Sequence, residues 1–517
     1  MKTIVIMLTI CVSIVSAAVN YVDVNSNGLN DGSSWVNAYT DLQTALETST
    51  AGDEIWMAAG TYYPSVEIEG TGDRFKAFHT VNGVAVYGGF AGNETAVEQR
   101  TDYGDGGANE TILSGDIGIP GDNSDNCYHV INNFDPGSGN LSADATTILD
   151  GLTIAYGNAN GADYIDMCGG GMLNHRGNPT LRNLVFKLNS AVYYGSALHC
   201  YVSSSKLDNS QFIQNTTTTY DATLYTNYCD GMVISDCDFL SNVSARYGGA
   251  VTNYYSSPTY NNTTFISNYA MGGGALYSNN ANPVFNNALF YDNEAYYSTT
   301  MEGYGGAIRS YSSNPTFNNA TIVNNTASNT GGGIYGDCTL NNCIIWGNTA
   351  VGQGDQIYST GTITMNNCCY SNETGDVQGY GTTTPNNCIT TDPQLLDPSN
   401  NDYHISGDSP CINMGNNSYN TQPYDLQGEI RIQDLIIDIG AYEWTFLAPE
   451  NILITRNTDS TLLDWTAASE AISYKIYRSD DPNGIFNLID TVTATTYTDN
   501  EVLSGNKYFY YVIAVNE

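Results

Sequence analysis

Residues 305–325 read GGAIRSYSSNPTFNNATIVNN, and they contain every element of a short pattern that recurs along the chain. A glycine pair comes first, followed by a small and an aliphatic residue. An apolar residue then stands three positions before an asparagine, here Ile322 and Asn325. The segments between are short and alternate in polarity, as in residues 315–322, which leaves no room for two helices and a loop. The pattern therefore predicts two or three short strands joined by turns.

The apolar residue of this pattern recurs with a period near 25. The steps between successive copies are 26, 27, 26, 25, 32 and 23 positions. The residues concerned are Phe186, Phe212, Phe239, Phe265, Phe290, Ile322 and Ile345. An asparagine or aspartate also stands three positions before each of them. A period of this length is typical of a solenoid in which each copy forms one coil.

We predict an all-β chain whose main part is a right-handed parallel β-helix. Coils would stack about 4.8 Å apart in parallel sheets, with the phenylalanine and aliphatic side chains forming an internal ladder. Asparagine tolerates the left-handed backbone conformation at turns, and glycine pairs would mark bends too tight for a Cβ atom. The 32-residue step predicts a loop that leaves one coil around residues 295–305.

The composition excludes several classes of function. The 517 residues carry 15 Lys and Arg against 53 Asp and Glu, a formal charge of −38, so nucleic acid and anionic membranes would be repelled. Only 13% of residues are charged, whereas 11% are aromatic, including 40 tyrosines. Coiled coils carry more charge and disordered chains carry fewer aromatic residues. A structured β-protein with a polar, weakly charged surface fits these numbers.

The N-terminus predicts export. Lys2 precedes an apolar run at residues 4–15, and the small residues Ser16, Ala17 and Ala18 follow. This arrangement is typical of a secretory signal peptide at residues 1–18, because the apolar run is too short to span a bilayer comfortably. No later run is long enough for a transmembrane helix. We therefore expect a protein that is secreted or held at a bacterial cell surface.

Several motifs resemble known β-helix families. The GGA(I/L) and FxxN pairs resemble the repeats of polymorphic outer-membrane proteins and of secreted right-handed β-helix proteins. Ser34-Trp35 and residues 41–46 and 52–56 resemble the entry segment of pectin-lyase-like β-helices. Residues 409–415 and 438–443 resemble the closing segment of choice-of-anchor Q proteins. The resemblance implies a β-helix over residues 19–445 and a surface location, and it does not specify an activity.

The same comparison of motifs divides the chain. Within the β-helix we expect an entry cap at 19–65, irregular early coils at 66–160, regular coils at 161–375 and a closing segment at 376–445. Residues 41–47 read as an amphipathic helix that can plug the first coil. Beyond them, residues 446–517 resemble a fibronectin type III domain, a β-sandwich of seven strands. The chain ends after the penultimate expected strand, which predicts a C-terminally truncated, incomplete sandwich.

Two columns of tyrosines are candidate ligand-binding residues. One column precedes the glycine-pair position and contains Tyr194, Tyr220, Tyr247 and Tyr304. The other stands eleven positions before the apolar residue and contains Tyr201, Tyr228, Tyr254 and Tyr311, with His175 at the same phase. Such columns can form a structural aromatic stack or a platform for sugar rings, and the two roles can coexist.

Catalytic residues are harder to assign from the sequence. β-Helix lyases need two things: a cation that neutralises a uronate, and a Lys or Arg that acts as the base. Hydrolases need a pair of carboxylates. No two basic residues of the coils share a column on adjacent coils, and the best candidates for a lyase site are His175 and Arg176, opposite Lys187.

Asp23, Asn25, Asn27 and Asp31 resemble the first half of a calcium loop, although the twelfth position is Ser34 rather than Glu. The alternative is an Asx-rich turn. Ca²⁺ is the one cofactor that the sequence suggests. Cys343 and Cys368 share a column and could form a disulfide, or both could remain buried thiols.

These observations support two functions. The first is a non-catalytic, adhesin-like or glycan-binding surface protein, monomeric, with a polysaccharide, a cell-surface glycan or a protein as its partner. The second is a polysaccharide lyase or glycoside hydrolase. A groove lined only by Tyr, Asn and Thr would favour the first, and a Lys/Arg cluster or a carboxylate pair on one exposed sheet face would favour the second.

Overall fold

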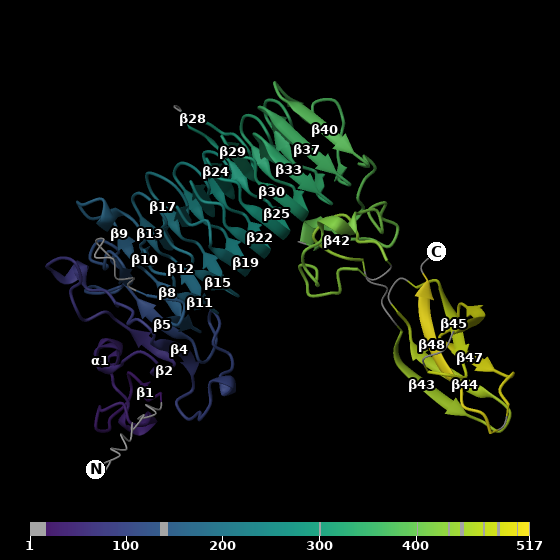
Figure 1. The fold of residues 1–517 in the computed structure, drawn as a ribbon, viewed down its shortest axis with the longest axis horizontal. Helices are drawn as coiled ribbons and strands as arrows, with labels where there is room; N and C mark the ends of the chain where they lie inside the picture. The colour runs from purple at the N-terminus through teal and green to yellow at the C-terminus, as the bar shows by residue number, and fades with distance from the viewer. Residues whose placement is uncertain are drawn as a thin grey trace, which may run out of the picture.

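The computed structural model describes residues 17–134, 143–298, 301–400, 402–432, 435–444, 449–468, 471–482, 486–503 and 505–515. Residues 1–16, and with them most of the predicted signal peptide, lie outside the described residues. Most of the described chain winds into one elongated solenoid of parallel strands (Figure 1). No helix in the described ranges is long and apolar enough to cross a membrane.

Three parallel sheets run along the solenoid, and the predicted parallel β-helix is therefore confirmed. The ten-stranded sheet contains β6 (Ile131–Asn133), β10 (Met172–His175), β14 (Leu198–Tyr201), β18 (Leu224–Asn227), β21 (Val251–Tyr254), β24 (Leu276–Asn279), β29 (Ile308–Tyr311), β32 (Ile334–Tyr335), β36 (Ile357–Ser359) and β39 (Val377–Gly379). The eight-stranded sheet contains β9 (Asn158–Ala159), β13 (Ser190–Ala191), β17 (Thr216–Thr217), β20 (Val243–Ser244), β23 (Tyr269–Ala270), β26 (Glu294–Ala295), β31 (Thr326–Ala327) and β35 (Thr349–Ala350).

The third sheet has twenty strands, because many coils contribute two. Its N-terminal strands are β1 (Val19–Val22), β2 (Glu54–Ala58), β3 (Gly60–Tyr62), β4 (Ala85–Phe90), β5 (Thr111–Ser114), β7 (Ile148–Asp150), β8 (Thr153–Ala155), β11 (Thr180–Arg182), β12 (Val185–Lys187), β15 (Lys206–Asp208) and β16 (Gln211–Ile213). The remaining strands are β19 (Val233–Leu240), β22 (Thr259–Ile266), β25 (Val284–Tyr291), β30 (Thr316–Val323), β33 (Cys338–Asn341), β34 (Ile344–Trp346), β37 (Thr362–Asn366), β38 (Cys369–Tyr370) and β40 (Thr382–Asn386).

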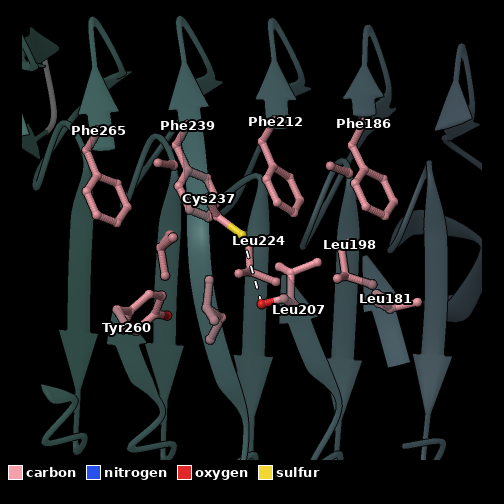
Figure 2. Close-up of a cluster of buried hydrophobic side chains, with 14 of the residues drawn as sticks. Leu181, Phe186, Leu198, Leu207, Phe212, Leu224, Cys237, Phe239, Tyr260 and Phe265 are labelled. Atoms are coloured by element: carbon pink, nitrogen blue, oxygen red, sulfur yellow. Dashed lines mark hydrogen bonds between the residues drawn. The ribbon is translucent and has the colours of Figure 1, made fainter. Parts of the chain in front are cut away.

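The predicted phenylalanine ladder fills the solenoid core (Figure 2). Phe186, Phe212, Phe239, Phe265 and Phe290 are fully buried. Their rings stack from coil to coil with centroid separations of 4.9, 4.6, 5.0 and 4.5 Å. Each ring takes this place because the parallel register pairs every phenylalanine with the next, as Phe186 with Phe212. Such stacking adds about 0.5–1.5 kcal/mol per pair to the burial of the rings.

Asparagines form two further columns. We call the recurring apolar residue of each repeat its anchor. The residue three positions before each anchor lies in the left-handed region, with φ of 50° at Asn262 and 52° at Asn287. This conformation bends the long strands of the twenty-stranded sheet, and asparagine adopts it at low cost. The column three positions after the anchor is buried: Asn242 Nδ2 donates to Phe212 O at 2.8 Å and to Asn268 Oδ1 at 3.0 Å.

A helix covers the N-terminal end of the solenoid, where the core and a sheet edge would otherwise be open. Helix α1 (Leu42–Thr48) is capped by Asp41, whose carboxylate accepts the Gln43 and Thr44 backbone N–H groups, and it buries Leu42, Ala45 and Leu46 in the core. The predicted plug of the first coil is thus confirmed. The described residues also contain six 3-10 helices: η1 (Trp35–Asn37), η2 (Asp73–Phe75), η3 (Val97–Gln99), η4 (Ile165–Met167), η5 (Pro398–Asn400) and η6 (Asn417–Tyr419).

The 32-residue step is an excursion, as predicted: β27 (Tyr297–Ser298) and β28 (Met301–Glu302) form an antiparallel pair outside the coils. The coils continue to β40, after which the chain folds back through the antiparallel pair β41 (Leu395–Asp397) and β42 (Asp402–Ile405). Tyr403 of this closing segment packs on Tyr291 at 4.4 Å, and the Ala441 N–H donates to Thr321 Oγ1 at 3.0 Å. The closing segment therefore lies against the twenty-stranded sheet.

The C-terminal residues form two antiparallel three-stranded sheets. One contains β43 (Glu450–Arg456), β44 (Thr461–Thr466) and β47 (Thr496–Asp499), and the other contains β45 (Ser473–Ser479), β46 (Asn487–Val492) and β48 (Phe509–Val515). The two sheets share an apolar core with Trp465, Tyr474 and Ile476. A small sandwich is present, and its assignment as a fibronectin type III domain stays a prediction.

Candidate functional site

The outer face of the ten-stranded sheet carries a series of aromatic side chains and Arg309. Successive residues of a strand point to opposite faces, and the first residue of each of these strands, such as Leu198 or Leu224, lies in the core. The second and fourth residues therefore face outward. The second residues form one row: Leu173, His199, Tyr225, Thr252, Tyr277, Arg309, Tyr335 and Tyr358.

Tyrosines from the preceding turns pack on this row. Tyr194 lies 4.4 Å from Tyr225, Tyr247 lies 4.5 Å from Tyr277, and Tyr304 lies 4.4 Å from Tyr335, measured between ring centroids. Tyr335 stacks in turn on Tyr358 at 5.4 Å. We call these residues the aromatic row, defined by Tyr194, Tyr225, Tyr247, Tyr277, Tyr304, Tyr335 and Tyr358. The row follows the solenoid axis over successive coils.

A cavity of about 410 Å³ opens at the N-terminal end of the aromatic row. It is lined by Phe134, Tyr164, Ile165, His175, Arg176, His199, Tyr201 and Asn227. His199 connects it to the row, because its ring lies 5.4 Å from that of Tyr225. Burial holds the pKa of His199 well below its usual range, so the imidazole is neutral at physiological pH.

The first tyrosine column has the predicted alignment at three of its four positions, and its role in ligand binding stays a prediction. Backbone bridges align Tyr194 with Cys168, and Tyr247 and Tyr304 with Gly272. Tyr220 is displaced by one residue, because its coil lacks the glycine pair and Ala222, with φ of 65°, takes the left-handed position. The Gly195 N–H consequently bonds to Asp221 O, and the Ala222 N–H bonds to Tyr247 O. Asp221 therefore occupies the place that a tyrosine holds in three other coils, at Tyr194, Tyr247 and Tyr304.

The second predicted column contains one wrong residue. The register runs through His175, Tyr201, Asn227, Tyr254, Asn279 and Tyr311. Tyr228 follows Asn227 and stacks on Tyr255 at 5.6 Å. The error arises because that coil has 27 residues, with its extra residue between β18 and Phe239, so counting back from Phe239 misses by one.

Asp221 lies within a cluster that the sequence did not predict. The carboxylate is 7% exposed, and its Oδ1 has no hydrogen-bond partner among the described residues. Burial raises the pKa of Asp221 to about 7, against the opposing effect of Arg246 and Arg309. The guanidinium of Arg246 lies 4.8 Å from the Tyr247 ring centroid, and that of Arg309 lies 4.6 Å from the same ring. Two cations thus share one aromatic ring beside a buried carboxyl group.

The sequence did contain a signal for part of this cluster. Arg309 directly follows the aliphatic residue of its repeat, as Tyr277 and Tyr335 do in theirs. Alignment on that aliphatic residue would have placed Arg309 in the aromatic row. Arg246 and Asp221 had no such signal, because the position of Asp221 depends on the local shift of the backbone at Ala222.

The predicted lyase site is not assembled. His175 ends β10, and Arg176 follows it as an exposed residue with φ of 61°. Lys187 lies on β12 of the twenty-stranded sheet, where its Nζ is 2.5 Å from Asp105 and 2.8 Å from Glu110. The prediction that these three residues form one site is therefore wrong, since Lys187 belongs to a different sheet and is already neutralised.

The residues of the predicted calcium loop serve local turns. Asp23 Oδ1 accepts the Asn25 N–H at 2.8 Å, and Asp31 Oδ1 accepts the Ser33 N–H at 3.0 Å. The Asn27 amide donates to Asn25 O at 3.2 Å. These contacts are those of an Asx-rich turn, and calcium binding here stays a prediction. Within the described ranges, no group of three or more His, Cys, Asp and Glu residues could hold a metal ion.

Of the two alternatives for Cys343 and Cys368, the disulfide is wrong and the buried thiols are observed, because all eleven described cysteines are free thiols. The Cys343 N–H donates to Cys368 Sγ at 3.4 Å, and Cys343 Sγ donates to Phe317 O at 3.4 Å. The two side chains occupy equivalent places in successive coils. Each sulfur atom donates to a backbone carbonyl of a neighbouring coil, Cys343 Sγ to Phe317 O and Cys368 Sγ to Leu340 O.

No family model matches the chain. An amylopullulanase of Thermoanaerobacterium saccharolyticum is 34% identical over 115 residues, which cover 22% of this chain and 8% of that protein. A poly(3-hydroxybutyrate) depolymerase of Ralstonia pickettii is 36% identical over 70 residues, which cover 13% of each protein. The chain thus spans far less than two thirds of these relatives. The alignment with a crystal structure of a pectate lyase covers 83% of this chain and 97% of the pectate lyase chain. The sequence identity is 12% and the TM-score is 0.32.

Proposed function

We propose that this protein binds an extracellular polysaccharide along the outer face of the ten-stranded sheet. The observation that carries the proposal is the aromatic row, which continues from Tyr194 to Tyr358 across successive coils. Strands of neighbouring coils are spaced about 4.8 Å apart, so the row places one ring per coil in a line. Tyr225, Tyr277 and Tyr358 are buried, and the half-buried Tyr194, Tyr247, Tyr304 and Tyr335 are the rings that a ligand can reach. A linear surface of this kind suits an extended polymer better than a compact ligand.

Polar groups beside the rings supply the contacts that sugar hydroxyls need. Asn227 and Asn279 alternate with Tyr201 and Tyr254 in the neighbouring outward row. Amide and phenol groups can both donate and accept hydrogen bonds, whereas the ring faces bury the apolar side of a sugar. The amylopullulanases that share segments with this chain are named for polysaccharides, which agrees with this class of ligand.

The leading form of the proposal is a non-catalytic, adhesin-like protein that is secreted or held at a cell surface, with the C-terminal sandwich as an accessory module of the fibronectin type III kind. The second candidate is a polysaccharide lyase or glycoside hydrolase. It is favoured by Asp221, a buried carboxyl group with a pKa near 7 beside Arg246, because enzymes tune their acid–base groups in this way.

Binding is tested by affinity electrophoresis in gels that contain neutral or acidic polysaccharides. We expect Tyr304→Ala and Tyr335→Ala, two half-buried members of the row, each to weaken retardation about 2- to 10-fold, since one aromatic contact contributes about 0.5–1.5 kcal/mol. The matched control is Tyr424→Ala, because Tyr424 is 53% exposed and lies in the closing segment. Retardation that is absent with every polymer, or unchanged in both variants, would overturn the proposal.

Catalysis is tested on the same polymers, with and without Ca²⁺, by measuring new reducing and unsaturated ends. End release that disappears in Asp221→Asn would establish the enzymatic candidate in place of the non-catalytic one. Binding without end release from any polymer would support the non-catalytic form.

A further inference from the structure

Arg246 and Arg309 differ from Arg182 and Lys187 of the regular coils in lacking a close carboxylate. Arg182 Nε lies 2.6 Å from Asp150, and Lys187 binds two carboxylates. By contrast, no ion pair within 4.0 Å is formed by Arg246 or Arg309 in the part of the chain that the structure describes. The Nε atoms of both are buried and have no hydrogen-bond partner among those residues. Buried guanidinium donors without an acceptor are costly unless a ligand supplies one.

The backbone makes room for this arrangement. Gly272 stands in the column where Tyr247 and Tyr304 stand in the neighbouring coils. A Cβ atom at Gly272 would lie 2.7 Å from Arg309 Nη1, so a side chain there would displace the guanidinium. The gap in the column thus lets Arg309 lie between two tyrosines, 4.6 Å from the ring centroid of Tyr247 and 5.2 Å from that of Tyr304.

The carboxyl group of Asp221 completes the cluster. It faces Arg246 and Arg309, and it lies near the phenols of Tyr194, Tyr225 and Tyr277. Its Oδ1 is buried and has no hydrogen-bond partner in the described ranges. Two guanidinium groups and one carboxyl group therefore converge on the aromatic row with unused hydrogen-bonding atoms.

We propose that Arg246, Arg309 and Asp221 form a subsite for the carboxylate of an acidic sugar within the bound polysaccharide. The inference rests on the proposed function and names its substrate class. The planar fork of a guanidinium matches a carboxylate with two parallel hydrogen bonds. Asp221 in its protonated form donates a third hydrogen bond to the ligand, while the neighbouring tyrosines contact the sugar ring.

The net charge of −38 does not contradict this assignment. Repulsion between exposed charges is screened over about 8 Å at physiological ionic strength. The two guanidinium groups lie at the sheet face itself, so a bound carboxylate would contact them directly. At about 0.15 M salt, the physiological ionic strength, we therefore expect uronate polymers to bind more tightly than neutral polymers.

The experiment compares polygalacturonate with dextran by titration calorimetry at equal monomer concentration. Hydrogen bonds to charged groups contribute about 1.5–3 kcal/mol, so Arg246→Gln and Arg309→Gln should each weaken polygalacturonate binding about 10- to 100-fold. Dextran binding should change less than about 2-fold, because an uncharged sugar forms no charge-assisted hydrogen bond with these side chains. The matched control is Lys206→Gln, a change of an exposed cation on β15. Dextran sulfate distinguishes a carboxylate site from a site for any anion.

The pH dependence provides a second readout. Polygalacturonate binding should weaken as pH rises from 6 to 8, because ionised Asp221 repels the ligand; Asp221→Asn should bind equally at both values. Arg309→Lys, which keeps the charge, replaces Arg309→Gln if the latter fails to fold.

Equal binding of polygalacturonate and dextran, with both arginine variants unchanged, would overturn the subsite and leave the proposed function intact. Absence of binding to either polymer would overturn both, and tighter binding of dextran sulfate would overturn the carboxylate assignment.

Discussion

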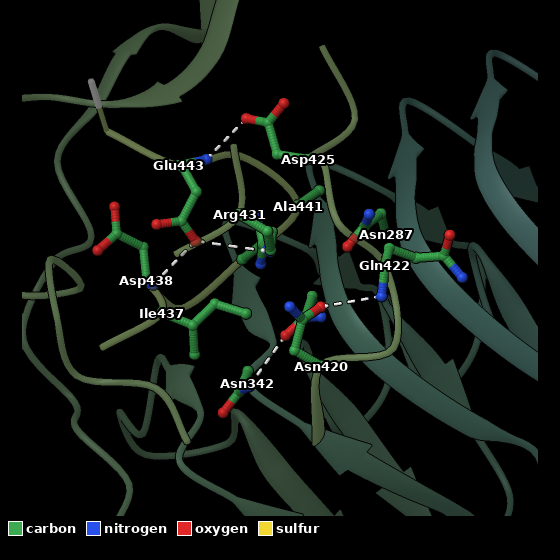
Figure 3. A network of polar contacts seen from close by, with 12 residues as sticks. Asn287, Asn342, Asn420, Gln422, Asp425, Arg431, Ile437, Asp438, Ala441 and Glu443 are labelled. Atoms are coloured by element: carbon green, nitrogen blue, oxygen red, sulfur yellow. Dashed lines mark hydrogen bonds and ion pairs between the residues drawn. The ribbon is translucent and has the colours of Figure 1, made fainter. Parts of the chain in front are cut away.

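Arg431 Nε lies 3.5 Å from a carboxylate oxygen of Glu443, and both side chains are buried within the closing segment (Figure 3). Asp425 and Asp438 lie nearby and accept the backbone N–H groups of Glu443 and Trp444 at 2.8 and 2.7 Å. One guanidinium thus faces three carboxyl groups. Burial raises the pKa of Glu443 to about 8 against the opposing effect of Arg431, and the negative charges of Asp438 and Asp425 add to the rise. The Arg431 side chain also donates to Gly440 O and so ties the loop together.

Replacing Arg431 should destabilise the closing segment strongly. We expect Arg431→Leu to lower the free energy of unfolding by about 3–5 kcal/mol, because buried carboxyl groups would lose their cation. Glu443→Gln should cost less, since Glu443 is mainly protonated at neutral pH. Urea unfolding measures both, and Arg176→Leu serves as an exposed control that should change stability by less than about 0.5 kcal/mol. Equal losses in Arg431→Leu and Glu443→Gln would contradict this account.

The buried asparagine ladder should be sensitive at a single position. Asn268 Oδ1 accepts the Asn242 backbone N–H at 3.0 Å, and its Nδ2 donates to Phe239 O at 2.9 Å. Asn268→Ala leaves these buried groups without partners, at about 1–3 kcal/mol each. Asn93→Ala, a change at an exposed asparagine, is the matched control. A shift of the thermal midpoint no larger than that of the control would show that the ladder is not stabilising.

Asp221 should give the folded protein a measurable pH dependence. Its pKa is raised from 3.8 to about 7, so the folded state binds more protons than the unfolded state between these values. The stability that this group contributes is therefore present at low pH and is lost as pH rises towards 7. We expect Asp221→Asn to be more stable than the parent at pH 8 by about 1–4 kcal/mol, with little difference at pH 4. Parallel pH profiles for the two proteins would argue against a buried carboxyl group.

Cys388 should be the most reactive thiol of the described chain. It is the one described cysteine that is not fully buried, and its pKa is lowered to about 7 by a hydrogen bond with Cys368. Cys200, Cys237 and Cys368 by contrast have raised pKa values because they are buried. Iodoacetamide at pH 7.5 followed by peptide mass spectrometry should label Cys388 first, and Cys388→Ser should remove that signal. Equally rapid labelling of a buried thiol would contradict the prediction.

Much of the fold could be predicted because its cause is local and periodic. Phe186 and Phe212 stack because parallel strands pair equivalent residues, and a repeat in the sequence states which residues are equivalent. The left-handed conformation at Asn262 follows from the tolerance of asparagine for positive φ, and α1 follows from its apolar face and its aspartate cap. Each of these inferences needs only the chain within one or two coils.

The sequence by itself therefore determined the solenoid, its apolar ladder and the plug at its entry. The sequence also placed Tyr194, Tyr247 and Tyr304 in one column, but only the tertiary structure showed how Asp221 and Lys187 lie relative to the candidate site. Asp221 faces the aromatic row because the left-handed residue moves to Ala222 in one coil, and Lys187 is separated from His175 because the two occupy different sheets. The physical reason is that a shift of one residue reverses the face on which a strand side chain lies, and the repeat pattern does not record such shifts.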